Sequence, residues 1–189
     1  MVKIHSTAEV DETAQIGEHT SIWNQSQVRN GVRIGQNCIL GKNVFIDSDV
    51  SIGNYVKIQN NCSVYHGSEL EDGVMLGPHV ILTNDKFPRA INPDGTLKTA
   101  DDWEVGPILI KYGASIGAGS IVLPNVTIGR FALIGAGSIV TKNVNDFELG
   151  YGNPFTVKGF VCKCGKPLLK GTSCSICEVS LNKDGAISE

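Results

Sequence analysis

The chain has 189 residues, a formal net charge of −3 at pH 7, 22 glycines and only 6% aromatic residues. This length suits one domain with a small appendage, and the slightly acidic balance offers no basic field for nucleic acid or an anionic membrane. Because no apolar run reaches signal-peptide length or the roughly 18 residues of a membrane span, we expect a cytoplasmic protein without nucleic-acid or membrane partners.

An aliphatic residue recurs at every sixth position from the start of the chain to position 82, and again from position 110 to 140. The first run is Ile4, Val10, Ile16, Ile22, Val28, Ile34, Leu40, Ile46, Ile52, Ile58, Val64, Leu70, Leu76 and Leu82. The second run is Ile110, Ile116, Val122, Ile128, Ile134 and Val140. Period six is not helical, but it is a multiple of two, so these side chains face the same side of extended segments.

The positions between the aliphatic residues follow the same period. Glycine often follows the aliphatic residue, and small or β-branched residues stand four positions after it. Between them lie residue types that tolerate positive φ and therefore indicate a corner in each repeat. These are Gly31, Asn37, Asn43, Asp49, Asn61, Gly67, Gly73, Gly119, Asn125, Gly137 and Asn143. Alternating short strands and corners predict a β-helix.

This repeat resembles that of the hexapeptide-repeat family, in which three hexads form one triangular coil. The resemblance implies an all-β fold, a left-handed parallel β-helix, whose twenty hexads would make about seven coils. We expect this domain to span residues 1–155, followed by a small cysteine-rich tail over residues 156–189. The hexads alone would also suit a non-catalytic scaffold.

The hexad phase is interrupted after Leu82. The next aliphatic position of the series is Ile110, and the interval between the two is not a multiple of six. We therefore expect residues 83–109 to form a polar loop expelled from the coil, and loops of this length are usually functional or disordered. Phe87, Trp103 and three prolines favour an ordered loop that packs on something.

Several segments around this loop resemble the hexapeptide N-acetyltransferases of nucleotide sugars. They are residues 57–65, 70–74, 77–78, 83–84 and 88–90. The resemblance is strongest to the group that acetylates the 3-amino group of UDP-2-acetamido-3-amino-2,3-dideoxyglucuronate, and related enzymes act on dTDP-linked 3-amino-3,6-dideoxyhexoses. It implies acetyl-CoA-dependent N-acetylation of a nucleotide-linked amino sugar for surface-glycan biosynthesis, in a homotrimer with sites between subunits. O-acetylation of a sugar and a scaffold role stay open as alternatives.

The implied reaction is attack of a neutral amine on a thioester, which needs orientation of the amine and removal of a proton. The resemblance places a residue that touches the sugar amine at Asn84, although an Asx turn would also explain an asparagine there. Asp85 and His79 are candidate bases, and His66 is a further candidate. A base is not obligatory, because the departing thiolate can take the proton.

Polar residues near the loop are candidates for holding the nucleotide sugar. Four of them either bind the substrate or form a face that packs against another subunit: Lys57, Gln59, Asn60 and Tyr65. Arg89 is a candidate partner for a sugar carboxylate or a diphosphate, through a two-pronged contact. An exposed salt bridge is the alternative for that arginine.

A groove for acetyl-CoA is expected where two similar segments lie three hexads apart. Gly117 and Ala118 in one segment match Gly135 and Ala136 in the other, so one coil separates them and they stack on one edge. With almost no side chains, these residues would let a pantetheine arm approach the backbone. Lys142 is a candidate for a CoA phosphate. Asn153 and Pro154 resemble the strand exit near CoA in hexapeptide transferases.

The tail contains two closely spaced cysteine pairs. Cys162 and Cys164 precede Cys174 and Cys177, with nine residues between the pairs. Two such pairs in a cytoplasmic protein suggest a structural four-thiolate zinc site, with free thiols or an oxidised pair as the alternatives. Cys38 and Cys62 occupy small-residue positions of the repeat, so we expect them to be packing residues.

Overall fold

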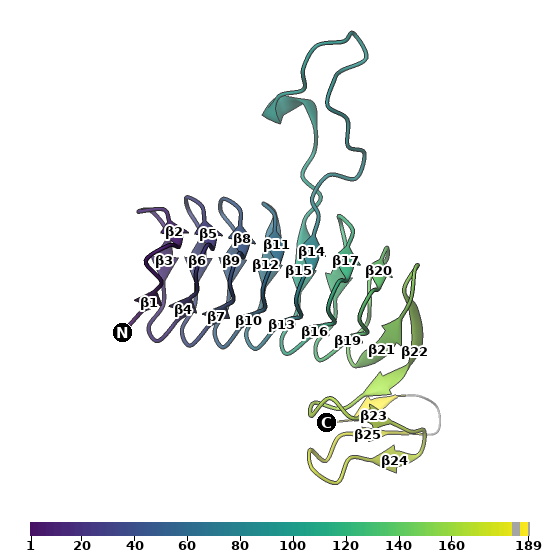
Figure 1. Cartoon of the computed structure of the whole chain (residues 1–189). Coiled ribbons are helices and arrows are strands. Elements are labelled where there is room, and N and C mark those ends of the chain that lie inside the picture. Colours follow the sequence, from purple (N-terminus) through teal and green to yellow (C-terminus); the bar gives the residue numbers. More distant parts are fainter. Residues whose placement is uncertain (183–185, 189) are drawn as a thin grey trace.

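The structure is a computed structural model that describes residues 1–182 and 186–188. The chain winds into coils whose strands line up in three parallel sheets along one axis, and the sheets enclose a common core (Figure 1). Sheet A contains β1 (Lys3–Ile4), β4 (Ser21–Ile22), β7 (Ile39–Leu40), β10 (Lys57–Ile58), β13 (Met75–Leu76), β16 (Ser115–Ile116), β19 (Leu133–Ile134) and β21 (Glu148–Tyr151). Sheet B contains β2 (Glu9–Val10), β5 (Gln27–Val28), β8 (Phe45–Ile46), β11 (Ser63–Val64), β14 (Ile81–Leu82), β17 (Ile121–Val122) and β20 (Ile139–Val140). Sheet C contains β3 (Gln15–Ile16), β6 (Arg33–Ile34), β9 (Ser51–Ile52), β12 (Ser68–Leu70), β15 (Ile108–Ile110) and β18 (Thr127–Ile128).

The register of these sheets shows how the hexads build a coil. Lys3 pairs with Ser21 and Lys57 pairs with Met75, so neighbouring strands of one sheet are three hexads apart. Each coil therefore uses three hexads, one strand from each sheet. The predicted all-β, left-handed parallel β-helix of hexapeptide repeats is confirmed.

The core is the stack of aliphatic side chains that the period predicts. Leu40, Ile58 and Leu76 have no exposed surface, and burial of such a side chain contributes about 1.5–3 kcal/mol. Cys38 and Cys62 are fully buried in the same core, as predicted for packing residues. Burial raises the pKa of the Cys62 thiol to about 11, so this thiol stays protonated and unreactive.

The corners have the left-handed backbone conformation that the residue types indicate. Ten of the eleven predicted corner residues have positive φ, and the prediction is wrong for Asn143. The last coil explains this exception, because Ile128 pairs with Val144 and this coil is two positions shorter than the regular coils of three hexads. Asn143 instead accepts a hydrogen bond from the Thr127 backbone N–H through its side chain, at 2.8 Å.

The turns between sheets form three edges along the prism. We call the turns from sheet A to sheet B the A/B edge, those from sheet B to sheet C the B/C edge, and those from sheet C back to sheet A the C/A edge. A long loop leaves the B/C edge between β14 and β15 and projects away from the coils (Figure 1). It contains the short 3-10 helix η1 (Ala100–Asp102). The predicted loop ends at residue 109, whereas β15 begins at Ile108, whose N–H donates to the Gly67 carbonyl.

The tail continues sheet A beyond the last coil. Strand β22 (Thr156–Val161) pairs antiparallel with β21, and β23 (Pro167–Leu168) pairs antiparallel with β22. A separate small sheet follows, formed by β24 (Thr172–Ser173), β25 (Ser180–Leu181) and β26 (Ile187–Ser188). The tail packs on Phe147 at the C/A edge, which is 2% exposed. Within the described ranges, no helix has the length and apolarity needed to cross a membrane.

Candidate active site

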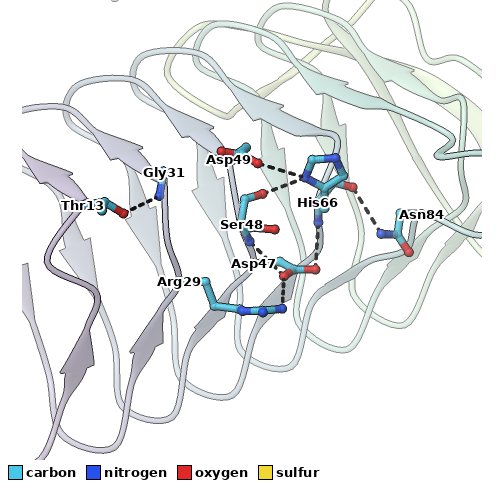
Figure 2. Close-up of polar contacts among 8 residues, drawn as sticks. All are labelled: Thr13, Arg29, Gly31, Asp47, Ser48, Asp49, His66 and Asn84. Carbon is cyan, nitrogen blue, oxygen red and sulfur yellow. Dashed lines mark hydrogen bonds and ion pairs between the residues drawn. The ribbon is translucent and has the colours of Figure 1, made fainter. Parts of the chain in front are cut away.

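The B/C edge stacks three polar residues from successive coils beside the base of the loop. Ser48, His66 and Asn84 lie at equal intervals of three hexads, so each occupies the same turn one coil further along. The Asn84 side-chain N–H donates to the His66 carbonyl at 3.3 Å, while its Oδ1 points away from His66 (Figure 2). The backbone of Asn84 also closes the loop, because its carbonyl accepts from the Gly106 N–H at 2.8 Å.

The ring of His66 has a defined orientation. Its Nδ1 lies 2.8 Å from the Ser48 carbonyl oxygen and 4.0 Å from a carboxylate oxygen of Asp49. Because a carbonyl oxygen only accepts, Nδ1 must carry the proton, which makes Nε2 of the neutral ring an acceptor. The side chain is 41% exposed, so this nitrogen is within reach of a ligand. His66 is thus a candidate general base beside Asn84.

A partly buried carboxylate fixes the position of this histidine. One oxygen of Asp47 accepts from Arg29 at 2.9 Å and from the Ser48 N–H at 2.8 Å, and the other accepts from the His66 N–H at 3.3 Å (Figure 2). The Asp47 side chain is only 14% exposed, so its bonds are shielded from water. The network thus links the backbone N–H of His66 to that of Ser48, one coil below, whose carbonyl orients the ring.

The loop adds two of the predicted residues to this edge. Asp85 follows Asn84 directly, and its carboxylate accepts from the Phe87 N–H at 2.8 Å, which forms an Asx turn. Arg89 is exposed, and its guanidinium donates to the Pro88 carbonyl. Beneath the loop lies a cavity of about 300 Å³, lined by Asp85, Lys86, Phe87, Lys98, Asp102, Trp103, Glu104, Val105, Gly106 and Asn125.

His79 lies on a different edge from Asn84. It occupies a left-handed corner of the A/B edge, with φ of 61°, and its Nε2 accepts from the Asn61 amide at 3.3 Å. Asn43 in turn donates to Asn61 at 2.9 Å, so the histidine ends a ladder of amides. Strand β14 separates His79 from Asn84, which are five residues or roughly 17 Å of extended chain apart. One chain therefore brings Asn84 and Asp85 together but not His79.

The four polar residues proposed to hold the sugar are divided in the same way. Lys57 is exposed on sheet A, and Gln59 and Asn60 follow it on the A/B edge. The side-chain oxygen of Asn60 accepts from the Lys42 N–H at 2.9 Å, so its amide is already engaged in the coil. Tyr65 instead follows β11 on the B/C edge, directly before His66.

The predicted groove for acetyl-CoA is a nearly bare stretch of backbone on the A/B edge. A Cβ on Gly117 would lie 2.4 Å from the Ala136 nitrogen, so the stacked coils require glycine there. Further out, Gly119 and Gly137 face open space, with no atom within 4 Å of where a Cβ would stand, and Ala118 is exposed. Backbone and methyl groups thus border this edge at the C-terminal coils.

The other residues predicted for the groove lie on two different edges of the prism. Asn153 and Pro154 follow β21 and flank the A/B edge, because Gly152 donates to the Ser138 hydroxyl at 3.2 Å and Phe155 donates to the Ile139 carbonyl at 2.8 Å. Lys142 follows β20 and therefore lies on the B/C edge. In a single chain this lysine is on the same edge as Asn84, away from the glycine groove.

The sulfur atoms of the four tail cysteines lie close together. Cys162, Cys164, Cys174 and Cys177 have all four sulfur atoms within 4.8 Å of one another. The backbone N–H groups of Ile176 and Cys177 point at the Cys174 sulfur and lower the pKa of this thiol to about 6. Cys174 is therefore ready to act as a thiolate.

Two models of hexapeptide repeats match this sequence. The bacterial transferase hexapeptide model, of six repeats, matches residues 13–48 and 49–84. The model of the hexapeptide repeat of succinyl-transferase matches residues 31–66 and 108–142. The matched residues are the coils on both sides of the expelled loop.

A characterised relative and two solved structures are similar to this chain. The dTDP-3-amino-3,6-dideoxy-alpha-D-galactopyranose 3-N-acetyltransferase of Aneurinibacillus thermoaerophilus is 37% identical over 87 residues, which are 44% of this chain and 45% of that protein. The chain thus matches less than half of that relative's length. The acetyltransferase domain of PglB from Neisseria gonorrhoeae, in complex with acetyl coenzyme A, has a TM-score of 0.55 at 18% identity, over 83% of this chain and 57% of that one. AntD, an N-acyltransferase from Bacillus cereus, has a TM-score of 0.52 at 24% identity, over 84% and 83%. At these identities the two structures share the fold.

Proposed function

This chain is a hexapeptide-repeat protein, and we propose that it is an acetyl-CoA-dependent N-acetyltransferase of a nucleotide-linked amino sugar. The main support for the proposal is that two polar side chains lie at the mouth of the loop: the Asn84 amide, which donates to the His66 backbone carbonyl, and the His66 ring, which the Ser48 carbonyl orients. The name of the relative from Aneurinibacillus supports the 3-amino group as the acceptor. Surface-glycan synthesis in the cytoplasm is the setting that this chemistry implies.

The two residues have complementary roles in the proposed reaction. The Asn84 Oδ1 accepts one N–H of the sugar amine, which turns the nitrogen lone pair toward the thioester carbonyl. The amine nitrogen forms a bond to the acetyl carbon, His66 Nε2 takes the proton that the nitrogen loses, and the carbon–sulfur bond breaks. The departing CoA thiolate leaves with that proton. The Ser48 carbonyl and the Asp49 carboxylate stabilise the transient positive charge on the ring.

Acetyl-CoA is proposed to lie along the A/B edge. The open space beside Gly119 and Gly137 admits a pantetheine arm close to the backbone, and Asn153 with Pro154 borders the same edge. A lysine such as Lys142 suits a CoA phosphate, but it projects from the other edge of its own chain. This arrangement brings the groove and the lysine together only when two chains meet.

A second copy of the chain is therefore part of the proposal. The amine-binding edge and the groove lie on opposite sides of sheet B, so one chain does not complete the site. The projecting loop exposes apolar side chains, with Phe87 76% exposed, Ile91 54% and Leu97 75%. Such a surface favours contact with another protein. We propose a homotrimer in which the loop of one subunit lies against the groove of its neighbour.

O-acetylation is the second candidate, and the orientation of His66 favours it specifically. A neutral hydroxyl is a weaker nucleophile than a neutral amine, so attack by a hydroxyl acceptor depends more on a base that removes its proton. The same two residues would then position and deprotonate the hydroxyl. The choice between the two reactions depends on the acceptor and not on the fold.

An assay of thiol release from acetyl-CoA tests the proposed function. We expect release of CoA that depends on an added UDP- or dTDP-linked 3-amino sugar, with a product heavier by one acetyl group. The parent sugars with a hydroxyl in place of the amine serve as matched controls, and NMR of the product locates the acetyl group. Release with the hydroxyl sugars alone would favour O-acetylation, and no release above hydrolysis with any acceptor would contradict both candidates.

A further inference from the structure

We propose that the tail holds one structural zinc ion, bound by the thiolates of Cys162, Cys164, Cys174 and Cys177. Their four sulfur atoms lie close together. Among residues 1–182 and 186–188, no other group brings together three or more His, Cys, Asp or Glu ligand atoms. The proposed site is independent of the acetyl-transfer site, because it lies beyond the last coil.

The spacing of the sulfur atoms fits a zinc ion rather than a disulfide. A tetrahedral zinc with Zn–S bonds of about 2.3 Å requires sulfur atoms about 3.8 Å apart. The Cys164 and Cys174 sulfurs are 3.7 Å apart, whereas a disulfide would bring them to about 2.05 Å. All four tail cysteines are free thiols. The structure thus places four unbonded sulfurs around a space of the size of one ion.

Two tight turns present these thiols to each other. In the first, the Cys162 N–H donates to the Lys166 carbonyl at 2.9 Å, and Gly165, with φ of 81°, returns its N–H to the Cys162 carbonyl at 2.8 Å. In the second, the Cys174 N–H donates to the Val179 carbonyl at 2.8 Å. Each turn therefore holds two thiols on a closed backbone loop before any metal arrives.

The ion would join two pieces of the tail that share a small core. The first turn connects β22 to β23, and the second lies between β24 and β25. Their common apolar cluster is Phe147, Cys162, Leu168, Val179 and Leu181, which is small for a unit that must stay folded. Units of this size commonly depend on a metal for stability. Zinc would hold the small sheet against the last coil.

Metal analysis and cobalt substitution test the site directly. We expect about one zinc per chain in reduced, purified protein, and almost none in Cys174→Ser/Cys177→Ser. The matched control is Cys62→Ala, which should keep its zinc, because Ala114 and Ala132 fill equivalent buried positions of the repeat. Cobalt added to the apoprotein should give thiolate charge-transfer bands and the intense visible bands of a tetrahedral ion.

Hydrogen exchange measures what the ion does. Removal of zinc by a chelator should increase exchange in residues 156–182 and leave the coils from β4 to β17 protected, since their cores do not include the tail. Zinc retained by the double cysteine variant would overturn the proposal. So would wild-type protein that binds neither zinc nor cobalt when reduced. If the double variant does not fold, the cobalt spectrum of the wild-type protein decides.

Discussion

Replacement of His66 by asparagine is expected to lower kcat for acetyl transfer by about 10²-fold or more, which is the usual contribution of a positioned general base. The reason is the orientation of the ring, whose Nδ1–H is held by the Ser48 carbonyl and whose Nε2 is left to accept a proton. Asparagine preserves a side-chain donor for that carbonyl but offers no nitrogen base. The fold should persist, because His66 lies outside the aliphatic core.

The pH profile separates a base from a merely structural histidine. A histidine base works only in its neutral form, so wild-type kcat should fall toward acidic pH, and this fall should be absent in His66→Asn. His19→Asn is the control, because His19 is an exposed left-handed corner residue in the turn between β3 and β4, and asparagine is favoured there. A loss of about 10²-fold in His79→Asn together with near-normal activity in His66→Asn would place the base on the A/B edge instead.

Replacement of Asn84 by alanine is expected to reduce kcat by about 5- to 150-fold, corresponding to roughly 1–3 kcal/mol for a lost orienting hydrogen bond. The KM for acetyl-CoA should change much less, since the proposed contact of the Asn84 side chain is to the sugar amine and not to CoA. The melting temperature should fall little, because Asn84 is half-buried outside the stacked core and its side chain makes one bond, to the His66 carbonyl.

Asn84→Asp shows which atom of the amide matters. Aspartate keeps an acceptor where the proposed amine N–H binds, but it loses the donor to His66. More activity in Asn84→Asp than in Asn84→Ala would therefore support the acceptor role of Oδ1. Full activity of Asn84→Ala with the best sugar would remove Asn84 from the mechanism and leave the loop without its proposed role.

The fold could be predicted in detail because it depends on one periodic feature. Every aliphatic residue of the hexad series from Ile22 onward faces the core, and the break after Leu82 marks the start of the loop. The error at Asn143 arose where the repeat ends, because the final coil is two positions shorter and the local hydrogen bond of that side chain replaces a left-handed corner. Period alone carries no information on where a solenoid stops.

The site could be predicted only in part. The sequence indicated Asn84 and also named His79 as a candidate base, but β14 places these two residues on different edges. His66 was a further candidate base that was not placed beside Asn84. Its signal was present, since it lies three hexads before Asn84 and hence one coil beneath it. The orientation of the ring depends on Ser48 and Asp49, whose contacts no spacing rule reveals.

We propose that the acetyl-transfer site combines the B/C edge of one chain with the A/B edge of another. The decisive measurement is the activity of trimers that contain two different variants. One variant is His66→Asn, and the other is Ala118→Glu/Ala136→Glu, which fills the exposed groove with side chains that repel CoA phosphates. Each alone should be nearly inactive in the thiol-release assay. Equal co-expression should restore about one quarter of wild-type activity, because a quarter of the interfaces then combine two intact edges. Mixed trimers, verified by native mass spectrometry, that remain as inactive as the separate variants would contradict the account.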